Sequence, residues 1–296
     1  MKQAFPFAAL CLYLVFTGCK PPPEPTGPAG TDPGGTTQGT PTTQTEPEDQ
    51  SLLPEGQPLT IESIGMDMAW IPAGKFIMGS PRSEDGHQLG EEDMHQVIIS
   101  RGFWMATLEV TQEQYQKLMG ENPSFWNSDP KLPVNKVDWH QAMEFCEILT
   151  DQEHNYGKIP KSWKFILPTE SQWEYACRAG TTTVFHHGNE RDILSQYAWF
   201  SENSQQRVKP VGLKKPNQWG MYDMHGNVGE WCFDWYGKKY PPDGSVDPIT
   251  QKASDFKVFR GGTYADPANR CRASYRNRNS PETQNPWIGF RVILSR

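Results

Sequence analysis

The sequence predicts an α+β domain that is rich in loops, with short strands and only a few helices. Three capping boxes mark helices before residue 180, and the more than 100 residues after Gly180 show almost no helical periodicity. The 11 Trp among 296 residues indicate that aromatic packing, more than long helices, holds the fold together.

Short strands are predicted ahead of the helices. Met68–Gly79 contains two apolar runs separated by Pro72 and Gly74, a pattern typical of a β-hairpin. Val97–Met105 predicts a further strand.

Each predicted helix has its own start signal. The capping boxes are Thr111-x-x-Gln114 with a stop at Gly120, Asp138-x-x-Gln141, and Thr169-x-x-Gln172 with a stop at Gly180. The apolar faces of the second and third helices are expected in the core, and they consist of Ala142, Phe145, Cys146, Leu149, Trp173, Ala176 and Cys177.

Length and charge exclude several classes of protein. Residues 51–296 suit one large domain better than two small ones. The formal net charge of -7 gives no global basic field for nucleic acid. No apolar run beyond the N-terminus reaches the roughly 20 residues of a membrane-spanning helix. A coiled coil, a helical repeat and an integral membrane protein are therefore excluded.

Residues 1–19 predict a lipoprotein signal peptide. Lys2 precedes an apolar stretch, and Phe16-Thr17-Gly18-Cys19 resembles a lipobox in which Cys19 would be lipidated. An ordinary cleaved signal peptide with an incidental Cys is the alternative.

Residues 20–50 hold 8 Pro, 5 Gly and 8 Thr, so they predict a disordered tether. We therefore expect an exported lipoprotein, anchored by its lipid to the membrane and displayed on the outer cell surface.

Four cysteines lie in the exported domain, where disulfides are permitted. Cys146, Cys177, Cys232 and Cys271 allow three pairings, which the sequence leaves open. Cys146 and Cys177 fall on apolar helix faces, which also fits buried free thiols.

Common catalytic motifs are missing from the sequence. It contains no G-x-S-x-G, no H-E-x-x-H, no phosphate-binding Gly-rich loop and no C-x-x-C. Hydrolase, kinase, zinc and dinucleotide sites are therefore not expected, and no catalytic residue is assigned.

A series of motifs nevertheless resembles one family. In order these are Met68–Gly79, Leu108-Glu-Val-Thr111, Pro133-Val-Asn-Lys-Val-Asp-Trp139, Leu167-Pro-Thr-Glu-Ser-Gln-Trp-Glu-Tyr-Ala176, Gly226-Asn-Val-Gly-Glu-Trp231, Arg260-Gly-Gly262 and Ile288-Gly-Phe-Arg291. Together they resemble the formylglycine-generating-enzyme, or sulfatase-modifying factor, family, over about residues 66–296. The resemblance implies a variant of the C-type lectin-like fold. That family contains oxidases and pure binding proteins, so the fold alone does not assign a function.

The resemblance also implies where metals would bind. Oxidases of the family hold copper(I) with two Cys, and the matching positions here are Asp266 and Cys271. Copper(I) requires soft thiolates, so no copper site and no oxidase activity are expected.

Calcium is the other metal of the family. The matching ligands here are the side chains of Asp223 and Glu230 and the carbonyls of Gly226 and Val228. Two carboxylates with backbone oxygens suit a hard cation. A calcium ion in a structural role is therefore expected, the alternative being a loop braced without metal.

The C-terminal segment has an unusual composition. Seven of the 12 Arg lie between Arg260 and Arg296, and segment 264–287 contains neither Lys nor Met. Except at Glu282, Gln284 and Trp287, codons ending in a pyrimidine can encode it, which is what mutagenesis of adenines in AAC or AAT codons leaves behind. The segment thus resembles the variable region of lectin-fold proteins that diversity-generating retroelements rewrite.

The resemblance divides the segment into two sets of positions. The framework positions are Ala268, Cys271, Arg272, Ser274, Arg276 and Pro281. The predicted variable positions, which would bind the ligand, are Tyr264, Ala265, Asp266, Pro267, Asn269, Arg270, Tyr275, Asn277, Arg278, Asn279, Ser280, Glu282, Thr283, Asn285, Pro286 and Trp287. Tyr, Trp, Arg, Asn and Ser are the residue types of antibody-like binding surfaces.

The expected function is therefore a surface lipoprotein that binds an unknown protein or glycan outside the cell. One alternative is an exported oxidase or related enzyme of the family, and a second is a glycan-binding lectin. A nucleic-acid partner is not expected, although residues 260–296 carry seven Arg against Asp266 and Glu282.

Overall fold

The computed structural model describes residues 53–90 and 92–296, which belong to one compact unit. Its helices are α1 (Gln112–Met119), α2 (Trp139–Asn155) and α3 (Glu170–Arg178), with short 3-10 turns η1 (Leu194–Gln196) and η2 (Ala268–Arg270). Its strands are β1 (Leu59–Ile61), β2 (Met66–Ile71), β3 (Gly74–Met78), β4 (His95–Ile99), β5 (Phe103–Ala106), β6 (Lys164–Ile166), β7 (Gly229–Trp235), β8 (Ser245–Val246), β9 (Lys257–Arg260), β10 (Asn277–Asn279), β11 (Ile288–Gly289) and β12 (Ile293–Ser295). Few helices and many short strands are the α+β architecture that the sequence predicts.

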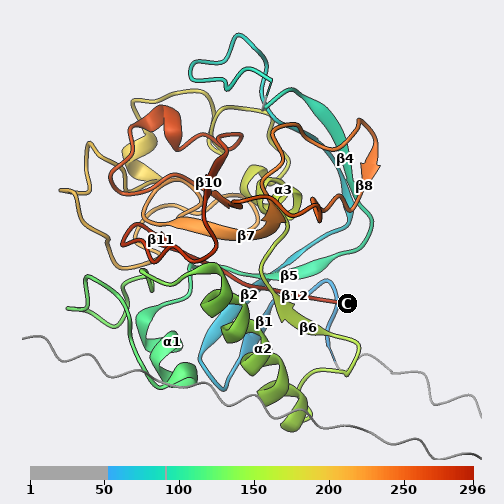
Figure 1. Cartoon of the computed structure of the whole chain (residues 1–296), viewed down its shortest axis with the longest axis vertical. Coiled ribbons are helices and arrows are strands. Elements are labelled where there is room, and N and C mark those ends of the chain that lie inside the picture. Colours follow the sequence, from blue (N-terminus) through green and yellow to red (C-terminus); the bar gives the residue numbers. More distant parts are fainter. Residues whose placement is uncertain (1–52, 91) are drawn as a thin grey trace, which may run out of the picture. The chain divides into compact units, whose positions relative to one another are not determined.

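Three small sheets share the strands (Figure 1). The first has the order β1-β2-β5-β12-β6, the second β10-β9-β7-β11, and the third β3-β4-β8. The last strand, β12, lies between β5 and β6 and is antiparallel to both, so the C-terminal residues are part of the central sheet.

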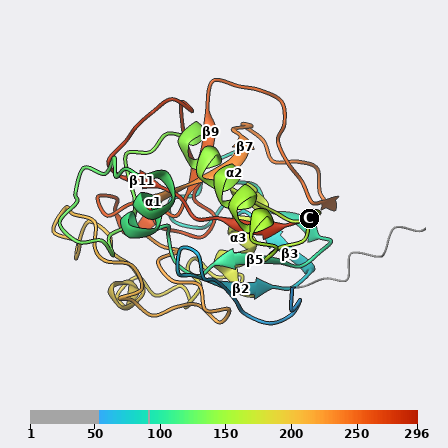
Figure 2. The same ribbon diagram turned by 90° about the horizontal axis from the view of Figure 1, so that it is seen from below.

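The core occupies both faces of the five-stranded sheet. Side chains alternate along β5, so Trp104 packs with one cluster while Phe103 and Met105 pack with the other. The first cluster includes the apolar face of α2, and the second includes Trp173 of α3. Figure 2, viewed from the side of α1 and α2, shows both helices in front of the sheet.

All three predicted capping boxes are confirmed. Thr111, Asp138 and Thr169 each accept a side-chain hydrogen bond from the backbone N–H three residues on, and the side-chain oxygen of the Gln there accepts one from the backbone N–H of the cap residue. The first helix stops at Gly120 as expected. The third ends one residue early, because Ala179 adopts the left-handed conformation ahead of Gly180. Every predicted core residue of α2 and α3 is buried.

Two strand predictions are wrong. The runs in Met68–Gly79 form β2 and β3, but they do not pair as a hairpin, because β2 joins β1 and β5 while β3 joins β4. Val97–Met105 is also not one strand: residues 100–102 separate β4 from β5, which belong to different sheets. Both errors concern pairing between distant segments, which local periodicity does not encode.

The predicted signal peptide, Cys19 and the tether 20–50 lie outside the described residues. Within residues 53–90 and 92–296, no helix combines the length and the apolar character that crossing a membrane requires.

Candidate ligand-binding surface

Segment 264–287 passes over the half of the domain that lies above β2, β5 and β12 in Figure 1. The chain leaves β9 through Gly261 and Gly262, and the segment then forms η2, adds β10 to the edge of β9 and leads into β11 beside β7. A Cβ on Gly262 would lie 2.6 Å from the carbonyl oxygen of Arg270, so only glycine allows this close approach.

Burial separates the two predicted sets of positions. All six framework residues are buried. Of the sixteen predicted variable residues only Tyr264 is buried, at 6% exposure, where it packs with Leu132, Val208 and Val228. Six are exposed, namely Ala265, Pro267, Arg270, Arg278, Glu282 and Trp287, and the other nine are half-buried.

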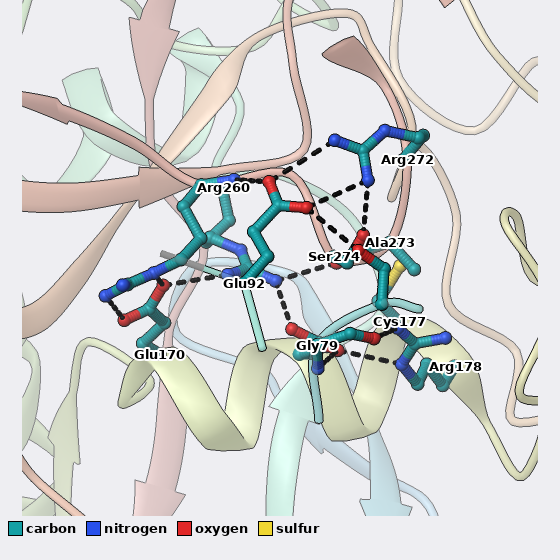
Figure 3. Close-up of polar contacts among 12 residues, drawn as sticks. Gly79, Glu92, Glu170, Cys177, Arg178, Arg260, Arg272, Ala273 and Ser274 are labelled. Atoms are coloured by element: carbon teal, nitrogen blue, oxygen red, sulfur yellow. Dashed lines mark hydrogen bonds and ion pairs between the residues drawn. The ribbon is translucent and has the colours of Figure 1, made fainter. Parts of the chain in front are cut away.

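Arg272 fixes the first half of the segment. Its guanidinium donates to Glu84 at 2.6 Å and to Glu92 at 3.0 Å, and to the carbonyl oxygen of Gly86. Glu92 is fully buried, so Arg272 supplies its counter-charge. Figure 3 shows Arg272, Ser274 and Glu92 in this network.

Arg276 and Arg260 fix the second half. Arg276 binds both carboxylate oxygens of Glu170, and Arg260 donates to Glu170 at 2.8 Å and to Glu174. Arg260 also donates to the carbonyl oxygen of Ala273 at 2.7 Å, which ties the backbone of the segment to the same network. The segment is therefore held by ion pairs to α3 and to the 84–92 loop.

These ion pairs correct the charge estimate for residues 260–296. Four of the seven arginines, Arg260, Arg272, Arg276 and Arg291, are buried counter-ions of glutamates. On the surface Arg270 pairs with Asp266, and Arg296 pairs with Glu55. Carboxylates therefore neutralise most of the local excess of arginine, and it gives no support to nucleic-acid binding.

A buried histidine, His225, contacts the backbone of segment 264–287 at Cys271. His225 Nδ1 lies 2.7 Å from the carbonyl oxygen of Cys271, and its Nε2 accepts from the backbone N–H of His186 at 3.1 Å. Burial, together with the neighbouring His186, lowers the pKa of His225 well below its usual value. A neutral ring that donates from Nδ1 and accepts at Nε2 satisfies both contacts.

The copper positions of the family hold one carboxylate and one thiol. Asp266 accepts from the hydroxyl of Thr263 at 2.8 Å and pairs with Arg270. Cys271 is fully buried, and burial raises the pKa of its thiol above the usual value. The soft thiolate pair that copper(I) requires is not formed by these two residues.

The predicted calcium ligands fit a cation only in part. The Oδ1 atom of Asp223 is buried without a hydrogen-bond partner, and burial raises the pKa of this carboxyl to about 6. Glu230, by contrast, binds Arg291 through both oxygens and accepts from the indole N–H of Trp173 at 2.6 Å. Gly226 and Val228 are buried. Calcium binding stays a prediction.

The described cysteines are all unpaired. Cys146, Cys177, Cys232 and Cys271 are buried free thiols, which confirms that alternative for Cys146 and Cys177. Burial raises the pKa of Cys177 to about 12.

Sequence reasoning missed the acidic partners of the framework. Glu170 and Glu174 lie inside the quoted motif Leu167–Ala176, four residues apart on α3, and Glu92 lies 180 residues from Arg272. The spacing of Glu170 and Glu174 places both carboxylates on one face of α3, and this was the available signal. Nothing in the nearby sequence indicated that their partners are arginines near the C-terminus.

Comparison with known proteins places this geometry in a family. Residues 57–296 match the family described as "Sulfatase-modifying factor enzyme 1-like domain". The chain belongs to this sulfatase-modifying factor family. Among the solved structures that resemble it, Treponema denticola variable protein 1 is 29% identical with a TM-score of 0.72, covering 80% of this chain and 97% of that one. PvdO from Pseudomonas aeruginosa is 26% identical with the same TM-score, covering 82% and 100%.

Several curated proteins are also similar in sequence. "Chaperone protein LppX" of Paenibacillus barcinonensis is 27% identical over 66% of this chain and 80% of its own length. The chain spans 40% or less of the next two curated relatives. Formylglycine-generating enzymes are among the others, so family membership confirms the predicted fold and leaves enzymatic activity unassigned.

Proposed function

We propose that this family member is a surface-displayed binding protein that contacts a macromolecular ligand through segment 264–287, whose predicted variable positions are diversified by a retroelement. The observation that carries the proposal is the division between buried framework residues and accessible predicted variable residues. The similarity to Treponema denticola variable protein 1 over 80% of the chain supports it.

This division suits a site that must accept many side chains. Each framework Arg is anchored to a buried Glu, so the backbone position does not depend on the side chains between the anchors. Substitution of an accessible side chain usually costs little stability, whereas substitution of a buried ion pair costs much. Trp287, which is 42% exposed, is placed to act as an aromatic anchor for a ligand.

Display would come from the N-terminus. We propose that Cys19 carries a lipid and that residues 20–50 act as a spacer, so that the domain is held at the outer cell surface. The residue types of the predicted signal peptide and tether support this.

We also propose that the domain is not an oxidase. The carboxylate at Asp266 and the protonated thiol of Cys271 support this. A copper-binding and thiol-oxidation assay on the purified domain tests it, and stoichiometric copper(I) binding would contradict it. Binding of glycans that a chelator abolishes would instead favour a lectin.

Deep sequencing of the 3′ end of the gene across many cells, with its flanking DNA, tests the diversified site. Substitutions confined to the sixteen predicted positions, with a nearby near-identical repeat whose adenines mark them, are expected. A uniform 3′ end without such a repeat would contradict diversification.

A further inference from the structure

The loop from Asn203 to Tyr222 concentrates positive charge at the surface. It contains Arg207, Lys209, Lys214 and Lys215 and no Asp or Glu, in a chain whose net charge is -7. Among the described residues, none of these four cations forms an ion pair with a carboxylate, whereas Arg191, Arg270 and Arg296 elsewhere on the surface do. Arg207 and Lys215 are exposed and present their charge fully to a partner, whereas Lys209 and Lys214 are half-buried, with Lys214 also attracted to the buried Asp223, and present theirs in part.

Aromatic rings hold these cations in place. The Arg207 guanidinium lies 5.0 Å from the ring centre of Trp126, and Lys214 Nζ lies 3.6 Å from that of Trp199. Lys209 lies over Trp199 at 5.7 Å, and Lys215 lies over Tyr197 at 5.5 Å. Cation–π contacts orient a charge without neutralising it.

The same loop contacts the first residues of segment 264–287. The Ser204 hydroxyl donates to the carbonyl oxygen of Tyr264 at 2.7 Å, and Ser201, two residues ahead of the loop, donates its N–H to the carbonyl oxygen of Asp266 at 3.0 Å. Trp126, beneath Arg207, packs in one cluster with Tyr264, and Phe125 stands edge-on to Trp126 at 5.0 Å. Phe125 is 61% exposed.

We infer that Arg207, Lys209, Lys214 and Lys215 form a cationic rim which, with Phe125, is a fixed part of the ligand surface and takes a protein partner with an acidic, aromatic-bearing surface. The inference rests on the proposed binding role of segment 264–287. Unpaired cations attract acidic partners and accelerate their association. An exposed phenyl ring beside them adds apolar contact area, and aromatic side chains are enriched in protein–protein interfaces.

The test compares polymers of defined chemistry as probes for the full domain. Random poly(Glu,Tyr) should bind, and its affinity should fall about tenfold or more between 50 and 300 mM NaCl. The variant R207Q/K209Q/K214Q/K215Q should bind about tenfold or more weakly and should lose most of this salt dependence. The matched control K158Q/K161Q/K238Q/K239Q removes the same charge from exposed lysines elsewhere and should bind as the wild type does.

A second variant separates charge from aromatic contact. Phe125→Ala should weaken binding of poly(Glu,Tyr) and leave binding of poly-L-glutamate unchanged. Equal losses in the rim variant and its control would overturn the inference. Tighter binding of heparin, or of phosphatidylglycerol vesicles, than of poly(Glu,Tyr) would also overturn it and would assign the rim to a sulfated glycan or to a membrane surface.

Different results would contradict the inference about the cationic rim and the proposal of a diversified segment. A uniform 3′ end would contradict diversification and leave the polymer measurements as they are. If Trp287→Ala weakens poly(Glu,Tyr) binding while the rim variant does not, segment 264–287 remains the ligand site and the rim is not part of it. Melting temperatures equal to that of the wild type would show that the variants are folded.

Discussion

The Arg276 guanidinium and the Glu170 carboxylate are joined by two hydrogen bonds of 2.6 Å, although 106 residues separate them in the chain. Burial alone would raise the pKa of Glu170, but Arg276 and Arg260 outweigh it and hold the pKa below its usual value. The carboxylate stays ionised, and the pair ties the predicted variable segment to the first turn of α3.

Arg276→Ala should destabilise the domain strongly. It leaves Glu170 with Arg260 as its one remaining counter-charge among the described residues, and breaking a buried pair costs about 3–5 kcal/mol. Urea unfolding measures the loss. Arg278→Ala, two residues on at an exposed position over the Tyr236 ring, is the control and should cost about 1 kcal/mol or less. Equal losses would show that the buried pair does not anchor the segment.

The contrast between these two arginines shows what the sequence can predict. Helix starts were predictable because a capping box is complete within four residues, as at Thr111 and Gln114. The acidic partners of the framework arginines were not predictable, because an Arg has the same local sequence signature whether it meets solvent or a buried Glu. Arg272 and Arg278 were counted alike in the local charge of residues 260–296, yet only Arg278 is exposed.

The candidate site could also be predicted only in part. The division of segment 264–287 into two sets came from residue types and resemblance, and burial follows it except at Tyr264. The cationic rim could not be placed beside this segment from the sequence, because loops 203–222 and 264–270 meet only in the folded chain. Likewise β2 and β3 were recognisable as strands, while their partners are set by packing.

Trp287 and Trp231 should separate binding from stability. Trp287→Ala should leave the melting temperature nearly unchanged and weaken ligand binding, because this ring is exposed. Trp231→Ala should cost about 3–5 kcal/mol, because the ring is fully buried and its indole N–H donates to the carbonyl of Val137. Thermal and urea unfolding measure both. A large loss of stability in Trp287→Ala would place that side chain in the core.

Calcium should stabilise the wild type if Asp223 is a ligand. An ion present at about 100 times its dissociation constant adds about 2.7 kcal/mol, which a melting curve in CaCl2 against EDTA resolves. Asp223→Asn should remove this gain. In EDTA at pH 7.5 the variant should be at least as stable as the wild type, because it replaces a carboxylate whose pKa burial raises to about 6. Identical curves of the wild type in CaCl2 and EDTA would favour the alternative, a loop braced without metal.

Cys19→Ala should release the protein from membranes. The lipid would be attached to the Cys19 sulfur, and without it no described helix could span the bilayer. Fractionation of cells that express the wild type and the variant measures this. Cys11→Ala, within the predicted signal peptide, is the control and should leave membrane attachment intact. Retention of Cys19→Ala in the membrane fraction would contradict the lipoprotein prediction.

Acid should weaken the histidine contact beneath the predicted variable segment. His186 stacks on His225 with ring centres 4.8 Å apart, and burial, with a contribution from His187, lowers the pKa of His186 to about 4. The folded state therefore binds this proton less readily than the unfolded chain, whose His titrates near 6.5. The contribution of His186 to the free energy of unfolding is therefore fully present above pH 6.5. It is lost as the pH falls toward 4, and the loss amounts to up to about 3 kcal/mol. Urea unfolding at pH 7, 5.5 and 4.5 should show a smaller loss in His186→Gln than in the wild type, while His140→Gln, at an exposed position, should follow the wild type. Equal losses in all three proteins would show that His186 does not set the acid sensitivity.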